Sequence, residues 1–212
     1  MKIVIITNGN KPSAQLAKDV CKQADTVYCC DGAAEFAKQA EIKIDILLGD
    51  MDSISVDTLK FFENSNIEII KLPTEKDATD TQFAADLASQ KGAKEIIFLG
   101  AVGSRIDHSL GNMHILERLF KIGISAKLID DNNIIYIIGE GRNEILGEKG
   151  KEVSILSVKG SVFINSTEGL YYPINNRALF LEEPLGISNV FLSDKAYVDV
   201  KSGEAFILIS KD

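Results

Sequence analysis

The chain has 212 residues, of which 45% are hydrophobic and 25% are charged, as expected for a globular protein of one large domain or two small ones. Its net charge of −8 at pH 7 argues against a nucleic-acid partner, which needs clustered positive charge. The longest apolar runs, such as residues 134–138, are far shorter than the roughly 20 residues needed to cross a bilayer. Because the N-terminus also turns polar too quickly for a secretory signal, we expect a cytoplasmic protein with no membrane span.

The first part of the chain alternates short β-branched apolar runs with stretches of helical spacing. Apolar residues three to four apart, as in Ala14, Ala17 and Val20 or in Phe83 and Leu87, favour amphipathic helices between the runs. Repeated strand, helix and strand units predict a mostly parallel six-stranded sheet with flanking helices. The predicted strands are residues 3–6, 27–30, 44–48, 67–72, 96–99 and 126–129.

The pattern changes after about residue 131. Apolar residues now alternate with a period of two, as in Val153 with Ile155 and Val162 with Ile164, and recurrent glycines are typical of turns between short strands. We therefore predict an α/β domain over residues 1–131, followed by a smaller all-β sandwich domain over residues 132–212.

Acidic segments follow four consecutive predicted strands. In an open α/β sheet, ligands bind beyond the carboxyl ends of the strands, so these carboxylates are expected at one edge. Asp50 and Asp52 are two residues apart and leave an extended chain on the same face, while Asp77 and Asp80 are three apart at the start of a predicted helix. The segments are Asp31-Gly32, Gly49-Asp50-Met51-Asp52-Ser53, Lys76-Asp77-Ala78-Thr79-Asp80 and Gly103-Ser104-Arg105-Ile106-Asp107-His108.

Such a cluster of carboxylates favours a bound cation. Two like charges about 4 Å apart repel by roughly 4 kcal/mol at an effective dielectric of 20, against a total stability of about 5–15 kcal/mol. Oxygen ligands without grouped His or Cys favour a hard ion, and Mg²⁺ leaves positions for water and phosphate oxygens. Arg105 and Lys76 offer positive charge suited to phosphate.

Each element also has a structural alternative. Asp77 can be a helix N-cap with Asp80 in the first turn, and Asp107 can cap a helix that begins near His108. The segment around Asp50 can be an acidic turn. The coincidence of all of them at successive strand ends favours a functional site.

The ordered set of segments, completed by Ile187-Ser188-Asn189, resembles the bacterial thiamine pyrophosphokinases over nearly the whole chain. The resemblance implies an N-terminal catalytic domain that binds ATP and Mg²⁺, a C-terminal β-sandwich that binds thiamine, and a homodimer with thiamine sites between subunits. It also implies transfer of the pyrophosphoryl group of ATP to the hydroxyl of thiamine, which gives thiamine diphosphate and AMP.

Carried over by position, the resemblance implies roles for individual residues. Mg²⁺ ligands are expected at Asp50, Asp52 and Asp80, with Asp77 nearby. Arg105 and Asp107 match the family's phosphate-side and acid/base pair. The other expected ATP-side residues are Asp31, Gly32, Lys76, Thr79 and His108, and the expected thiamine-side residues are Ser188, Asn189 and Tyr172.

Some roles are left open at this point. Asp107 and Asp77 are both candidates for the base that accepts the hydroxyl proton, provided that burial or neighbouring charge raises the pKa. Ala33 and Glu35 depart from the family's D-G-G-A-N pattern, which affects the expected ATP contacts. The alternative functions are another Mg²⁺-dependent phosphoryl- or nucleotidyl-transfer enzyme and a non-catalytic sensor of thiamine or nucleotide.

Overall fold

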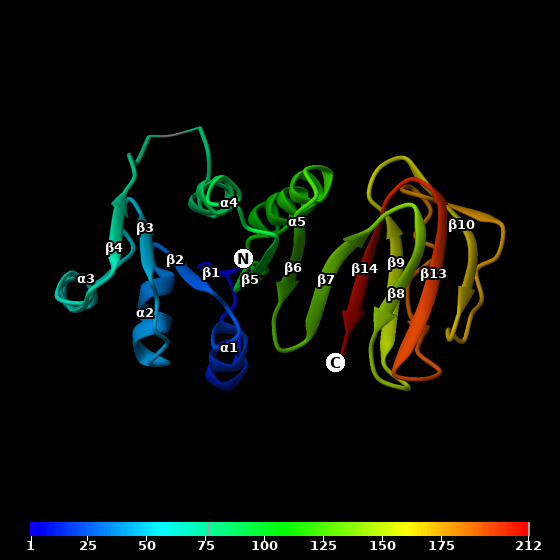
Figure 1. Cartoon of the computed structure of the whole chain (residues 1–212), viewed down its shortest axis with the longest axis horizontal. Coiled ribbons are helices and arrows are strands. Elements are labelled where there is room, and N and C mark those ends of the chain that lie inside the picture. Colours follow the sequence, from blue (N-terminus) through cyan, green and yellow to red (C-terminus); the bar gives the residue numbers. More distant parts are fainter. Residues whose placement is uncertain (76, 212) are drawn as a thin grey trace. The chain divides into compact units, whose positions relative to one another are not determined.

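The computed structural model describes residues 1–75 and 77–211 and divides into two compact units, Met1–Asp131 and Asn132–Asp212. Figure 1 shows both units and labels most of their helices and strands. Lys76, which the sequence places on the ATP side, lies outside the described residues.

The first unit alternates strands and helices, which confirms the predicted α/β fold. Each of the six predicted strands is present, with ends that differ from the prediction by at most two residues. The elements are β1 (Lys2–Ile6), α1 (Ala14–Cys21), β2 (Thr26–Cys30), α2 (Ala33–Gln39), β3 (Ile46–Gly49), α3 (Val56–Glu63), β4 (Glu68–Lys71), α4 (Asp80–Gln90), β5 (Glu95–Leu99), α5 (Ile106–Lys121) and β6 (Ser125–Ile129).

The strands of this unit pair in the order β6-β5-β1-β2-β3-β4, and their pairings are parallel. The chain moves outward from β1 to β4 on one side of β1 and then crosses to β5 on the other side. The crevice between the carboxyl ends of β1 and β5 is therefore the topological switch point, where sheets of this kind bind ligands.

Helices cover both faces of this sheet (Figure 1). On one face, α1, α2 and α3 contribute Ala17, Ala34 and Phe62 to a core that also contains Val4 and Ile6 of β1. On the other face, α4 contacts α5, β1 and β2. A fully buried aliphatic side chain stabilises the fold by about 1.5–3 kcal/mol, so this double-sided burial fixes the strand ends that carry the site.

The second unit is all-β, as predicted. Its strands form two sheets, in the orders β12-β9-β14-β7 and β11-β10-β13-β8. Inward-facing Val162 and Ile164 share one buried cluster with Ile155, Val198 and Ile207. The strands are β7 (Asn133–Ile138), β8 (Gly141–Leu146), β9 (Glu152–Ser157), β10 (Ser161–Glu168), β11 (Arg177–Phe180), β12 (Asn189–Val190), β13 (Lys195–Ser202) and β14 (Ala205–Ser210).

Within the described residues, we find no helix with the length and apolar character that a membrane crossing requires.

Candidate functional site

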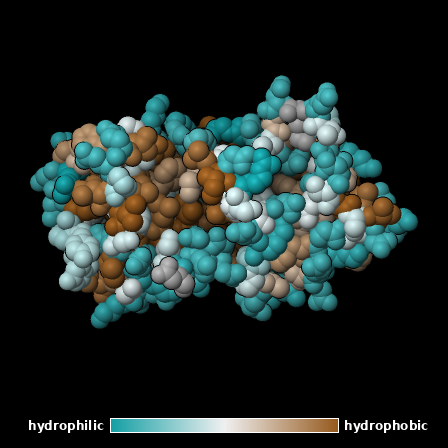
Figure 2. Space-filling view, turned by 180° about the vertical axis from the view of Figure 1, so that it is seen from behind, coloured by the Kyte–Doolittle hydropathy of each residue, from teal (hydrophilic) through white to brown (hydrophobic). Residues whose placement is uncertain are grey.

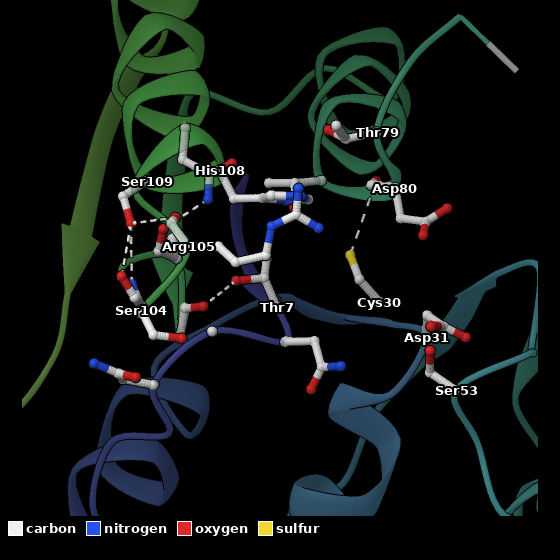
Figure 3. Close-up of a pocket in the computed structure, with 18 of the residues that line it drawn as sticks. Thr7, Cys30, Asp31, Ser53, Thr79, Asp80, Ser104, Arg105, His108 and Ser109 are labelled. Atoms are coloured by element: carbon white, nitrogen blue, oxygen red, sulfur yellow. Dashed lines mark hydrogen bonds between the residues drawn. The ribbon is translucent and has the colours of Figure 1, made fainter.

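A cavity of about 590 Å³ lies at the switch point of the first unit. Residues 7–10 after β1 and residues 100, 101 and 103–105 after β5 contribute to its wall. They are joined by Cys30 at the end of β2, by Asp31 directly after it and by residues 78–81 around the start of α4. Figure 3 shows Asp31 and Asp80 on one side of this cavity and Arg105, His108 and Ser109 on the other. Four segments that are distant in sequence thus meet at one crevice.

The backbone between β1 and β5 closes one wall of the cavity. The Thr7 hydroxyl donates to the Gly100 carbonyl oxygen over 2.6 Å, and the Gly9 N–H donates to the same oxygen over 2.7 Å. A Cβ atom at Gly9 would lie 2.4 Å from that oxygen, and Gly100 has a φ of +68°. Glycine is needed at both positions for this close approach, so the wall is a tightly tied loop pair.

Three carboxylates gather beside this cavity. Asp31, Asp50 and Asp52 each offer an oxygen within 4.8 Å of the others. Asp31 is 9% exposed, and its Oδ1 atom is buried without a hydrogen-bond partner among the described residues. An unpaired buried oxygen is costly, and a hard cation held by several carboxylates relieves that cost. The three residues therefore fit a divalent ion such as Mg²⁺.

Strand register brings Asp31 to the carboxylate pair. Cys30 pairs with Leu48, and the Asp31 N–H donates to the Leu48 carbonyl oxygen over 2.8 Å. Asp31 and Met51 both have positive φ, at 44° and 69°, a conformation that costs about 1–3 kcal/mol in a residue other than glycine. Both loops that carry the carboxylates thus contain a residue in a strained backbone conformation.

The grouping differs from the predicted ligand set of Asp50, Asp52 and Asp80. Within the described part of the chain, the compact group contains Asp31 in place of Asp80. Asp80 lines the same cavity as Asp31, from the first turn of α4, and its carbonyl oxygen lies 3.9 Å from the Cys30 sulfur.

The observed start of α4 shows which residue caps this helix. The N-cap is Thr79, whose hydroxyl oxygen accepts from the Gln82 N–H over 3.1 Å, so the alternative that Asp77 caps this helix is wrong. Asp77 is exposed and does not line the cavity, whereas Thr79 does. The capping role of Thr79 explains how Asp80 is held at the cavity.

Arg105 and Asp107 form a two-point ion pair. The Arg105 Nη2 and Nε atoms donate to the Asp107 carboxylate over 2.6 and 3.3 Å. This hydrogen bonding holds the pKa of the Asp107 carboxyl below its usual value and raises the pKa of Arg105. Because a general base at neutral pH needs a raised carboxyl pKa, Asp107 in this arrangement is ionised but weakly basic.

The observed start of α5 shows that Asp107 does not cap this helix. The helix begins at Ile106, and its N-cap position is Arg105, which makes no side-chain capping bond. Asp107 lies inside the first turn, so the alternative that Asp107 is the cap is wrong. Ser109 instead ties the loop, because its hydroxyl oxygen accepts from the Gly103 N–H over 3.0 Å and its O–H reaches the Arg105 carbonyl oxygen at 3.2 Å. His108 is exposed and lines the cavity.

Several cavity residues were missed by the sequence analysis. Asn8 and Asn10 follow the first predicted strand, so the rule applied to the later strands also identifies them. Ser109 and Asn112 lie in the first two turns of α5, and the Asn112 Nδ2 donates to the Ala101 carbonyl oxygen over 2.6 Å. No local pattern distinguishes such residues from other polar residues on a helix.

The departures from the family pattern have structural explanations. Ala33 is fully buried in the core of the first unit. The Glu35 carboxylate accepts from the Ser55 N–H and the Thr58 hydroxyl, each over 2.8 Å, and these hydrogen bonds, with Ser55 the larger cause, lower the pKa of Glu35. Glu35 therefore ties α2 to the start of α3, and it does not line the cavity.

In the second unit, Asn189 supports Tyr172. Asn189 is 3% exposed, its Oδ1 accepts from the Tyr172 N–H over 2.9 Å, and its Nδ2 donates to the Tyr172 carbonyl oxygen over 2.7 Å. The Tyr172 ring is 60% exposed and meets Tyr171 edge-on at 4.8 Å. Ser188, next to Asn189, is exposed and has a φ of 55°. The three predicted thiamine-side residues thus lie in one local arrangement.

Two family models match this chain. The model described as "Thiamin pyrophosphokinase, catalytic domain" matches residues 17–128, which is more than half of the chain. The model described as "Thiamin pyrophosphokinase, vitamin B1 binding domain" matches residues 142–205.

Individual proteins are similar as well. A thiamine pyrophosphokinase from Bacillus subtilis is 30% identical over 165 residues, covering 77% of both chains. A thiamine pyrophosphokinase from Oryza sativa is 28% identical over 157 residues, which are 70% of this chain and 59% of the rice protein. A crystal structure of thiamine pyrophosphokinase from Bacillus subtilis superimposes with a TM-score of 0.88 at 25% identity over the whole of both chains.

Proposed function

The chain belongs to the thiamin pyrophosphokinase family, and on that premise we propose that it transfers the pyrophosphoryl group of ATP to the hydroxyl of thiamine. The products are thiamine diphosphate and AMP. The observation that carries this proposal is the convergence of Asp31, Asp50 and Asp52 beside the cavity at the switch point.

We propose that the two units bind different substrates. We assign ATP and Mg²⁺ to residues 1–131 and thiamine to residues 132–212. The catalytic and vitamin B1 binding family models match on either side of this boundary, which supports the assignment. We propose the cytoplasm as the location of the reaction.

Asp31, Asp50 and Asp52 would hold Mg²⁺, with Asp80 facing the same cavity from α4. When bound, the ion would neutralise charge on the phosphate oxygens. Arg105 carries a fixed positive charge at the cavity, suited to the oxygens of the transferred group. These residues act by positioning and by electrostatics, which supply most of the catalysis in phosphoryl transfer.

The thiamine hydroxyl attacks the β-phosphorus of ATP in line with the departing AMP, and its proton must be accepted by a base. The ion pair with Arg105, which lowers the pKa of Asp107, makes Asp107 a poor proton acceptor. If Asp107 is the base, Arg105 must first turn toward the phosphates, which raises the pKa of Asp107. Asp77 lies outside the cavity lining and would have to move toward the cavity to accept this proton.

In the second unit, the exposed Tyr172 ring is proposed to stack on the rings of thiamine, with Ser188 beside it. The Asn189 side chain is already engaged by the Tyr172 backbone. Its role in thiamine binding is therefore to position Tyr172, and a direct contact to the vitamin is not needed.

A homodimer is also proposed, and one sheet face of the second unit supports it. Leu156, Phe206 and Leu208 alternate along β9 and β14 with the core residues Ile155 and Ile207, so they point away from the sandwich core. They remain partly exposed. Figure 2 shows hydrophobic side chains gathered on the side of the view that holds the second unit. An apolar face of this kind marks an interaction surface.

The proposed reaction is tested by mixing the purified protein with thiamine, ATP and Mg²⁺ and identifying both products by mass. Thiamine diphosphate together with AMP supports the proposal. Thiamine monophosphate with ADP indicates a different phosphoryl transfer, and binding of thiamine without consumption of ATP indicates a sensor.

A further inference from the structure

We propose that Lys11 is a positioning residue for ATP, and that it acts by orienting the Asn8 side chain so that its amide NH₂ group donates to an oxygen of the polyphosphate chain. This inference rests on the proposed function, because it takes ATP as the ligand of the switch-point cavity. Neither residue belongs to the acidic segments that the sequence analysis singled out.

Lys11 contacts two residues of the cavity wall. Its Nζ atom donates to the Asn8 Oδ1 over 2.6 Å and to the Thr7 carbonyl oxygen over 3.2 Å. Asn8 and Thr7 both line the cavity, whereas Lys11 is not among the lining residues. Thr7 is in turn tied to Gly100 across the crevice, so the ammonium group is anchored to a rigid part of the wall.

The contact with Lys11 determines which way the Asn8 carboxamide faces. An ammonium group only donates hydrogen bonds, so the atom that it touches must be the carboxamide oxygen. The NH₂ group is therefore at the other end of the carboxamide. Within residues 1–75 and 77–211, the hydrogen bond found for this carboxamide is the one that its oxygen accepts, which leaves the NH₂ group as a donor for a ligand.

The NH₂ group lies beside Gly32, next to the loops that carry the carboxylates. A Cβ atom placed on Gly32 would be 2.5 Å from the Asn8 Nδ2 and 3.1 Å from the Ser53 Cβ. Gly32 follows Asp31, and Ser53 follows Asp52. The absence of a side chain at Gly32 therefore lets Nδ2 reach the place where phosphate oxygens would meet a metal ion held by the aspartates.

The charges of the site make such a donor useful. The carboxylates repel the polyphosphate chain, and the whole chain carries a net charge of −8. Lys11 adds a positive charge behind the donor, and an amide whose oxygen is bound to a cation is a more polarised donor. Burial, the largest cause, lowers the pKa of Lys11, as expected for an ammonium group partly withdrawn from water.

The test measures nucleotide binding apart from turnover. The probe is α,β-methylene ATP, whose bridge cannot be cleaved by pyrophosphoryl transfer, with Mg²⁺ and without thiamine. We expect Lys11→Met and Asn8→Ala each to raise its dissociation constant about tenfold, the loss of one good hydrogen bond, and to raise KM for ATP similarly. KM for thiamine should stay within about twofold, and Lys11→Arg should restore most of the affinity because it keeps a charged donor.

A double variant shows whether Lys11 acts through Asn8. If it does, Lys11→Met adds little in the Asn8→Ala background, because the effects of interacting residues are not additive. The proposal is overturned if the two losses multiply, if Lys11→Met leaves binding unchanged, or if Lys11→Arg fails to restore it. Lys22→Met, on the exposed end of α1, is the matched control and should bind the probe like the unmodified protein.

Failure of the proposed function gives a different result. If the protein binds the probe but forms no thiamine diphosphate, the proposed reaction is wrong. The comparison of probe binding between variants still decides the role of Lys11. A protein that does not bind the probe at all overturns this inference as well. Because Asn8 is exposed, Asn8→Ala should fold, and it keeps the binding comparison available even if Lys11→Met folds poorly.

Discussion

The backbone of Gly49 lies directly against the side chain of Asp31: a Cβ atom at Gly49 would be only 2.8 Å from the Asp31 Cβ, and Gly49 has a φ of +147°. We therefore expect Gly49→Ala to displace Asp31 from Asp50 and Asp52. Divalent-ion affinity should fall roughly 10- to 100-fold, as when other residues that orient metal ligands are changed. Titration with Mn²⁺ followed by electron paramagnetic resonance measures this.

Gly111 provides the control for that substitution. It lies in α5, and a Cβ atom there would have nothing within 4 Å. Gly111→Ala should stabilise the protein by about 0.5–1 kcal/mol through helix propensity and leave Mn²⁺ binding unchanged. If Gly49→Ala and Gly111→Ala lowered Mn²⁺ affinity equally, the loss in Gly49→Ala would not come from displacement of Asp31.

A second prediction compares aspartates by position. Asp31→Asn removes a member of the compact carboxylate group, so Mn²⁺ affinity should fall by roughly tenfold or more. Asp77→Asn changes an exposed residue outside the cavity and should leave Mn²⁺ affinity within about twofold, near the experimental scatter for surface changes. Unaltered affinity in Asp31→Asn would remove Asp31 from the ligand set.

A third prediction concerns the pKa of Asp107. The Arg105 hydrogen bonds depress it, so the carboxyl should titrate below the ordinary Asp value of about 3.9. The associated stabilisation is present above the unfolded-state pKa and is lost as the pH falls through the folded-state pKa. In Arg105→Gln, the carbon-13 NMR titration midpoint of the Asp107 carboxyl should rise toward the ordinary value. An unshifted midpoint would mean that the ion pair does not persist in solution.

A fourth prediction distinguishes two roles for Asn189, which are to hold the backbone of Tyr172 in place and to contact thiamine directly. Asn189→Ala leaves the Tyr172 N–H and carbonyl without partners, so the second unit should lose about 2–4 kcal/mol in urea unfolding and KM for thiamine should rise. Tyr172→Ala removes an exposed ring, so KM for thiamine should rise with little change in stability. If Asn189→Ala raised KM without loss of stability, a direct contact of Asn189 with thiamine would be the better explanation.

The proposed homodimer gives a fifth prediction. Phe206→Glu combined with Leu208→Glu places charges on the apolar face of β14, and burying them unpaired is costly. Light scattering should show a dimer for the unmodified protein and a monomer for the variant. Lys201→Glu, an exposed change on β13, should stay dimeric. A variant that remains dimeric would place the interface elsewhere.

Much of the fold was predictable because its signals are local. The alternation of β-branched runs with helical spacing reports strands and helices one segment at a time, and the loss of helical spacing after residue 131 reports the all-β region. Asp50 and Asp52 were likewise predicted to lie together, but the stated reason, an extended chain, is wrong: β3 ends at Gly49, Met51 has a φ of 69°, and the segment is the acidic turn given as the alternative. Thr79 as the cap of α4 was missed, because Asp and Thr are both common N-cap residues and only the observed helix start distinguishes Thr79 from Asp77.

The sequence by itself determined the strands, the residues at their carboxyl ends and the family to which these residues belong. Tertiary structure alone decided which of those residues meet: the pairing of Cys30 with Leu48 brings Asp31 to Asp50 and Asp52, and the crossover from β4 to β5 opens the crevice at β1. The contact of Lys11 with Asn8 beside Gly32, and the engagement of Asn189 by Tyr172, depend on the same kind of long-range placement. Strand order and register are set by burial of both sheet faces at once, a constraint that no single segment of sequence contains.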